Sequence, residues 1–184
     1  MHDRGKFWSS PPDWRAAALS SSGVCVASAR DSGTLWLVSG DLAAFLAERQ
    51  GKPPILGPRD TCGDGAYALR LAPDRVLYVS PVPETAAEGW SSKGYAVSDI
   101  SKGMLLIDLV GPSGGSVLAA GTGYDLASTD QRPQESAQLL IAGHRIGLCR
   151  RKDGWRLHVE RPIAPALWHW LETAGGLARE KGAS

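Results

Sequence analysis

The sequence predicts an α+β fold, in which antiparallel hairpins are joined by many turns and accompanied by a few short helices. First, 22 Gly and 12 Pro in 184 residues favour frequent turns over a helical bundle. Second, 43% hydrophobic and 21% charged residues are typical of a globular domain. Third, several short apolar segments are separated by turn residues, and they recur in pairs along the chain.

The N-terminal third predicts an arm, two strands and a helix. Residues 1–22 are rich in Ser, Pro and Ala, which predicts an N-terminal arm. The apolar segments 24–27 and 34–38 predict strands, since they are separated by turn residues. Residues 41–50 have helical spacing of apolar residues, with Asp41 as the expected N-cap and Gly51 as C′ residue, and 51–65 is expected to be loop.

Three hairpins follow from the turn chemistry. Their expected strands are 66–71 with 75–80, 138–142 with 145–150, and 145–150 with 155–160. Asp153-Gly154 is expected to supply a positive φ in the last turn. In 155–160 apolar residues alternate with Arg156, His158 and Glu160, which predicts a strand buried on one face only.

The rest of the chain predicts one more strand and two helices. Residues 104–110 form the most apolar expected strand, 112–120 a short helix, and a last helix begins near 162–165 and ends at Gly175-Gly176. These elements predict a single domain over 23–176, with two subdomains divided near 98–103 as the alternative. Residues 177–184 are expected to be a C-terminal tail.

Charge and cysteine content exclude several classes of function. The chain has 20 Lys+Arg and 19 Asp+Glu, and its longest cationic run is only Arg150-Arg151-Lys152, which argues against a nucleic-acid partner. No apolar run approaches the roughly 20 residues that span a bilayer, so no membrane association is expected. Three widely spaced cysteines without a C-x-x-C motif argue against a zinc ribbon and a disulfide scaffold. We therefore expect a reduced, cytoplasmic protein.

The candidate catalytic motifs are weak. Gly111-Pro112-Ser113-Gly114-Gly115 matches G-x-S-x-G, but that motif belongs in a parallel sheet and these strands pair as hairpins, so a helix start at Pro112 explains it better than a hydrolase. The four histidines have no metal-binding spacing, and Cys149 is expected to be a buried, inert thiol. The interior carboxylates of interest, for which capping is the ordinary role, are Asp99, Asp108 and Asp125. No catalytic, cofactor-binding or metal-binding residue is predicted in this chain.

Tryptophans are unusually frequent and several lie towards the two ends of the chain. There are seven Trp and only two Phe, and aromatic residues of this kind often anchor interfaces. Trp168 and Trp170 lie on roughly opposite faces of a helix, so one of them is free for another surface when the other enters the core. The expected partner-contact residues are Phe7, Trp8, Trp14, Trp168 and Trp170.

Several segments, in order, resemble a known superfamily. They are Ala-Leu-Arg-Leu-Ala-Pro-Asp-Arg-Val-Leu at 68–77, Ala-Val-Ser-Asp-Ile-Ser at 96–101, Leu-Leu-Ile-Asp-Leu-Val-Gly-Pro at 105–112, Val-Leu-Ala-Ala-Gly at 117–121 with Tyr-Asp-Leu at 124–126, Val-Glu-Arg-Pro-Ile-Ala at 159–164 and Leu-Trp-His-Trp-Leu at 167–171. Together they resemble the glycine-cleavage T-protein (aminomethyltransferase-like) superfamily, and the last two resemble the ending of the γ subunit of heterotetrameric sarcosine oxidase. Pro162 and Ile163 replace the Ser-Phe that is usual in that ending. The resemblance covers residues 66–175.

The resemblance implies a role in a larger complex. Sarcosine oxidases demethylate sarcosine to glycine, producing hydrogen peroxide and formaldehyde or methylenetetrahydrofolate. The resemblance implies α, β and δ partner subunits, of which α is the expected main contact, and FAD, FMN, NAD and tetrahydrofolate held by those subunits. The γ subunit is expected to be non-catalytic and to stabilise the complex.

Two alternatives stay open. One is the equivalent subunit of N-methylglutamate dehydrogenase or of another N-methyl amino acid demethylase. The other is a stand-alone folate-binding protein, in which Asp99 or Asp125 would hold the pterin.

Overall fold

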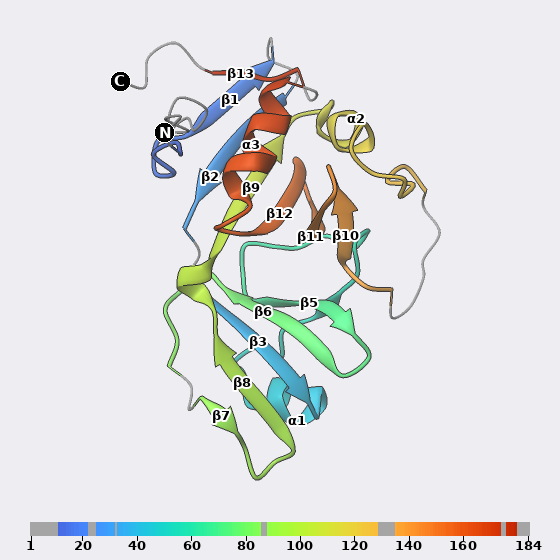
Figure 1. The fold of residues 1–184 in the computed structure, drawn as a ribbon. Coiled ribbons are helices and arrows are strands. Elements are labelled where there is room, and N and C mark those ends of the chain that lie inside the picture. The colour runs from blue at the N-terminus through green and yellow to red at the C-terminus, as the bar shows by residue number, and fades with distance from the viewer. Residues whose placement is uncertain are drawn as a thin grey trace, which may run out of the picture.

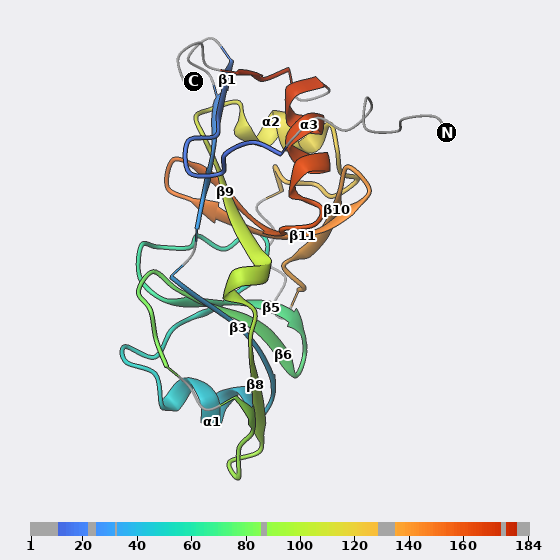
Figure 2. The same ribbon diagram turned by 60° about the vertical axis from the view of Figure 1, so that its left-hand side comes forward.

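Two β-sheets lie face to face in the computed structural model, and helices cover their outer faces (Figures 1 and 2). The structure describes residues 11–21, 25–31, 33–85, 88–128, 135–173 and 176–179. Every neighbouring pair of named strands is antiparallel except the short parallel pair β4–β5. This arrangement confirms the predicted α+β class.

The seven-stranded sheet contains strands from both ends of the chain. Its order is β10-β11-β12-β9-β2-β1-β13. The bounds are β1 Ala18–Ser21, β2 Cys25–Arg30, β9 Met104–Val110, β10 Gln138–Ile141, β11 His144–Arg151, β12 Gly154–Glu160 and β13 Ala178–Arg179.

The six-stranded sheet is built from one continuous stretch of chain between β2 and β9. Its order is β4-β5-β6-β3-β8-β7, with β3 Thr34–Gly40, β4 Ile55–Leu56, β5 Tyr67–Ala72, β6 Arg75–Ser80, β7 Gly89–Trp90 and β8 Tyr95–Asp99. A short 3₁₀ helix, η2 Ser101–Gly103, leads from this sheet back to β9.

Three apolar layers hold the sheets and helices together. Helices α2 Gly114–Ala119 and α3 Ala164–Thr173 pack on the outer face of the seven-stranded sheet. Helix α1 Leu42–Ala47 packs on the outer face of the six-stranded sheet. The third layer lies between the sheets and includes Leu35, Leu69 and Leu77 from the six-stranded sheet and Met104 and Cys149 from the other. The inner faces of both sheets are therefore buried.

The expected hairpins are confirmed. β5 pairs with β6, β10 with β11, and β11 with β12. The expected N-cap is also confirmed, because the Asp41 carboxylate accepts a hydrogen bond of 2.9 Å from the Ala44 N–H at the start of α1.

Parts of the expected arm and tail are strands in the structure. Residues 18–21 form β1, and residues 178–179 form β13, which pairs with β1. Leu19 is fully buried and Leu177 nearly so, and both belong to the core beneath α3. Each segment offers only one deeply buried apolar side chain, too few to produce an alternating pattern that sequence analysis could detect.

Strand β12 was predicted to be buried on one face, and this is wrong. Trp155, Leu157 and Val159 pack in the layer under α3. Arg156 and His158 are buried on the opposite face, where both contact the Tyr67 hydroxyl of the six-stranded sheet. The alternation of apolar and polar residues is correct. Its polar face meets a second sheet instead of water.

The role expected of Gly154 is also wrong. Its φ lies outside the left-handed region, and the positive φ values of a two-residue hairpin turn occur instead at Ala142 and Gly143, between β10 and β11. A Cβ on Gly154 would lie 1.9 Å from the Leu109 carbonyl oxygen of β9. Glycine is therefore required there by the close approach of the neighbouring strand.

Candidate functional site

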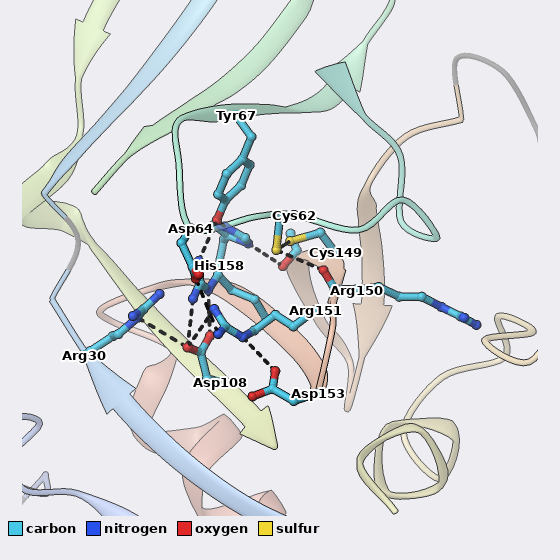
Figure 3. Close-up of polar contacts among 12 residues, drawn as sticks. Arg30, Cys62, Asp64, Tyr67, Asp108, Cys149, Arg150, Arg151, Asp153 and His158 are labelled. Carbon is cyan, nitrogen blue, oxygen red and sulfur yellow. Dashed lines mark hydrogen bonds and ion pairs between the residues drawn. The ribbon is translucent and has the colours of Figure 1, made fainter. Parts of the chain in front are cut away.

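A group of polar side chains lies between the two sheets, with Arg30 at its exposed end, and we call it the inter-sheet polar cluster (Figure 3). It consists of Arg30, Cys62, Tyr67, Asp108, Cys149, Arg151, Arg156 and His158. The cluster is unusual because charged groups rarely lie in an otherwise apolar layer unless they are paired.

An ion pair between β9 and β12 forms the first part of the cluster. Arg156 lies directly opposite Asp108 in the strand register, and its Nε and Nη2 donate hydrogen bonds of 2.7 and 2.9 Å to the two carboxylate oxygens. The guanidinium groups of Arg30 and Arg151 lie 3.4 and 3.6 Å from the same carboxylate. Burial raises the pKa of Asp108, while the charges of Arg30 and Arg151 oppose that shift.

A tyrosine–histidine pair forms the second part and joins the two sheets. The Tyr67 hydroxyl of β5 lies 2.8 Å from His158 Nε2, and His158 Nδ1 lies 3.2 Å from the Gly147 carbonyl oxygen. Since a carbonyl only accepts, Nδ1 carries the proton and Nε2 accepts from the tyrosine. Burial lowers the pKa of His158 to about 4, so the imidazole is neutral near pH 7.

The third part is a pair of thiols. The sulfur atoms of Cys62 and Cys149 are 2.6 Å apart, and the Cys62 thiol also lies 3.0 Å from the Arg150 carbonyl oxygen. Both residues are free cysteines and both are buried. Burial of Cys149 agrees with the sequence prediction, whereas its pairing with Cys62 was not predicted, because 87 positions separate the two in the chain.

Two hollows adjoin these residues. A cavity of about 180 Å³ is lined by Arg30, Tyr67 and Arg156, and a wider groove of about 850 Å³ lies between α2 and the turn that joins β11 to β12. Drug-sized ligands occupy pockets of roughly 300–1,000 Å³, so the groove has that size and the cavity beside Arg156 does not. Among the residues that the structure describes, no group of three or more His, Cys, Asp or Glu side chains is placed to hold a metal ion.

The sequence-predicted carboxylates separate into two kinds. Asp99 and Asp125 are exposed and have local roles, since Asp99 accepts hydrogen bonds from Ser101, and Asp125 from the N–H groups of Ala127 and Ser128. Asp108 alone of the three belongs to the buried cluster. The structure therefore does not bring Asp99 and Asp125 to a common site with Asp108.

The expected partner-contact tryptophans pack largely on the chain itself. Of the two helix tryptophans, Trp168 is the one in the core, with 2% of its surface exposed, and its role as a partner contact stays a prediction. Trp14 packs edge-on against Trp168, with ring centroids 5.7 Å apart. Trp170 is half-buried and lies over Gly121, where a Cβ would come within 2.6 Å of its ring. Phe7 and Trp8 lie outside the described residues.

Sequence analysis missed an exposed tryptophan in the middle of the chain. Trp90 of β7 is 74% exposed, on an edge strand of only two residues. The sequence did contain a signal for this exposure. The neighbours Glu88, Gly89 and Ser91 form no alternating apolar pattern that would indicate a buried Trp90.

The comparisons with known proteins show similarity to solved structures. No protein-family model matches the chain, and no curated protein matches it either. Among solved structures, one chain of the heterotetrameric sarcosine oxidase from Corynebacterium sp. U-96, solved in complex with pyrrole 2-carboxylate, superposes with a TM-score of 0.68. The two chains share a fold. The alignment covers 88% of each chain at 19% sequence identity, so the two chains are also of nearly equal length.

The helices of the described residues are short. Within them, no helix combines the length and the apolar character needed to cross a bilayer.

Proposed function

We propose that this chain is the non-catalytic, γ-type subunit of a heterotetrameric oxidase that demethylates sarcosine or another N-methyl amino acid. The observation that carries the proposal is the fold shared with a sarcosine oxidase chain over 88% of both chains. A match of this extent, between chains of nearly equal length, supports an equivalent place in an assembly.

The buried cluster supports a structural role for this chain. A general base needs a free acceptor atom facing its substrate. His158 instead uses both ring nitrogens within the fold, and Asp108 is bound by Arg156 through both oxygens. In the proposal, FAD, FMN, NAD and tetrahydrofolate are held by the partner subunits α, β and δ, and this chain stabilises their assembly, mainly through α.

Purification of the tagged chain from its native host tests the proposal. We expect unlike partner subunits to accompany the chain in fixed stoichiometry, with a flavin absorption band and sarcosine-dependent release of hydrogen peroxide. A complex that oxidises another N-methyl amino acid, or that reduces a different electron acceptor, would identify the N-methylglutamate dehydrogenase type of enzyme.

Folate binding by the isolated chain tests the remaining alternative. We would titrate the purified chain with tetrahydrofolate and follow tryptophan fluorescence, with Asp99→Asn and Asp125→Asn as variants. A colourless chain that is purified alone and binds folate saturably would overturn the subunit proposal in favour of a stand-alone folate-binding protein.

A further inference from the structure

We propose that Cys62 and Cys149 form a peroxide-sensitive dithiol, which closes to an intramolecular disulfide that links the two halves of the fold. The first support is the geometry of the pair. The sulfur atoms are 2.6 Å apart, only about 0.6 Å beyond the length of an S–S bond. No large movement of either backbone is therefore needed to form the bond.

The backbone holds the two thiols in this position from both sides. The Cys62 N–H donates to the Arg150 carbonyl oxygen at 2.9 Å, and the Arg150 N–H donates to the Asp60 carbonyl oxygen at 3.0 Å. These bonds place residues 60–62 beside the end of β11, so Cys62 and Cys149 face each other. Pre-alignment of this kind raises the effective concentration of one thiol at the other.

The surroundings of the two sulfur atoms give them different reactivity. The hydrogen bond from Cys149 and the charge of Arg151 lower the pKa of Cys62, although burial opposes this shift. Burial raises the pKa of Cys149. Because the thiolate is the nucleophile, Cys62 reacts first and Cys149 supplies the second thiol.

Cys62 also lies at the edge of the buried layer. Thr61 and the segment Gly63-Asp64-Gly65 are exposed, and a Cβ on Gly65 would meet no atom within 4 Å. A small hydroperoxide therefore has to pass only this open segment to reach Cys62. The third cysteine, Cys25 of β2, is fully buried in the core beneath α3 and serves as an internal reference.

The proposed reaction uses one hydroperoxide molecule. The Cys62 thiolate attacks one peroxide oxygen and the O–O bond breaks, which converts Cys62 to a sulfenic acid. The leaving hydroxide or alkoxide takes up a proton. The Cys149 sulfur then attacks the Cys62 sulfur, the S–OH bond breaks, and hydroxide leaves as water with the Cys149 proton. The two thiols lose two electrons, and the peroxide gains them.

The experiment uses the full chain, reduced and then treated with hydrogen peroxide. We expect the intact mass to fall by about 2 Da, as two hydrogens are lost, and peptide mapping to find Cys62 joined to Cys149. After denaturation only Cys25 should react with an alkylating reagent, and dithiothreitol should restore all three thiols. The oxidised chain should also melt at a higher temperature, because the new bond closes a long loop.

Three variants separate this reaction from general oxidation. Cys25→Ser should cross-link like the wild type, and Cys62→Ser should not cross-link at all. Cys149→Ser should stop at the Cys62 sulfenic acid, seen as a gain of about 16 Da that a diketone reagent traps. The proposal is overturned when peroxide leaves all three wild-type thiols free, or when Cys62 gains oxygen without joining Cys149. Neither result depends on partner subunits, so each is independent of the proposed function.

Discussion

Arg156 binds both carboxylate oxygens of Asp108 from the neighbouring strand, with distances of 2.7 and 2.9 Å, in the layer between the two sheets. Two further guanidinium groups, those of Arg30 and Arg151, lie beside the same carboxylate. The buried Asp108 carboxylate is therefore the counter-ion of Arg156, and it also attracts the more exposed Arg30 and Arg151.

Removal of that charge should destabilise the fold strongly. We expect Asp108→Asn to lower the free energy of unfolding by about 3–5 kcal/mol, because Arg156 is left buried without its counter-ion. Urea unfolding measures this loss. Asp153→Asn, at a half-exposed carboxylate that pairs with Arg151, is the matched control and should cost about 1 kcal/mol or less. Equal losses in the two variants would contradict the importance of the buried pair.

The free energy of unfolding should decrease as the pH is lowered, because His158 binds a proton more readily in the unfolded chain than in the folded chain. Its pKa is about 4 in the folded chain and about 6.5 when unfolded, so the unfolded chain binds the extra proton between these values. Stability is unaffected by this group above about pH 6.5 and declines as the pH falls toward 4, at up to about 1.4 kcal/mol per pH unit.

Two histidine variants test that pH dependence by urea unfolding between pH 4 and 7. His158→Gln should lower stability at neutral pH and flatten the decline at acidic pH. His169→Gln, on the exposed face of α3, should keep the wild-type slope. An unchanged slope in His158→Gln would show that another group causes the decline.

The tryptophans should differ sharply in their effect on stability. Trp168→Ala should cost about 3–5 kcal/mol, because it leaves a cavity beneath Trp14 in the core. Trp90→Ala, at a side chain that is 74% exposed, should change stability by no more than about 0.5 kcal/mol. Thermal or urea unfolding of both variants gives the comparison, and a large loss in Trp90→Ala would contradict the exposed placement of β7.

Gly154 should tolerate no side chain. We expect Gly154→Ala to cost about 1–3 kcal/mol or more, since its Cβ would collide with the Leu109 carbonyl of β9. Gly65→Ala is the matched control, because a Cβ there meets open space and φ is not in the left-handed region. Stability of Gly154→Ala equal to wild type would mean that β9 and β12 separate easily at this end.

The hairpins and the main helices could be predicted because their signals are local. Turn residues between apolar segments were enough to place β5 with β6 and β11 with β12, and Asp41 was enough to start α1. The assignment of β2 and β3 to different sheets could not be predicted. Both are short apolar strands in sequence, and only the long-range pairing of β2 with β9 separates them.

Sequence analysis named Asp108 but missed the rest of the candidate site, for a physical reason. Arg156 and His158 alternate with apolar residues, a pattern that normally indicates a face in water. Their actual surroundings depend on Tyr67 and Asp108, which lie 89 and 48 positions from Arg156 in the chain. No local pattern reports partners at such distances, and this also holds for Cys62 and Cys149.

The pairing of β1 with β13 has a consequence for synthesis of the protein. The six-stranded sheet uses only residues between 34 and 99, so all of its strands are synthesised before β9. The other sheet begins with β1 and is completed only by β13, the last of its strands to be translated. During translation β1 therefore lacks its outer neighbour, and a nascent chain arrested before residue 178 would present an open strand edge to which chaperones or other chains can bind.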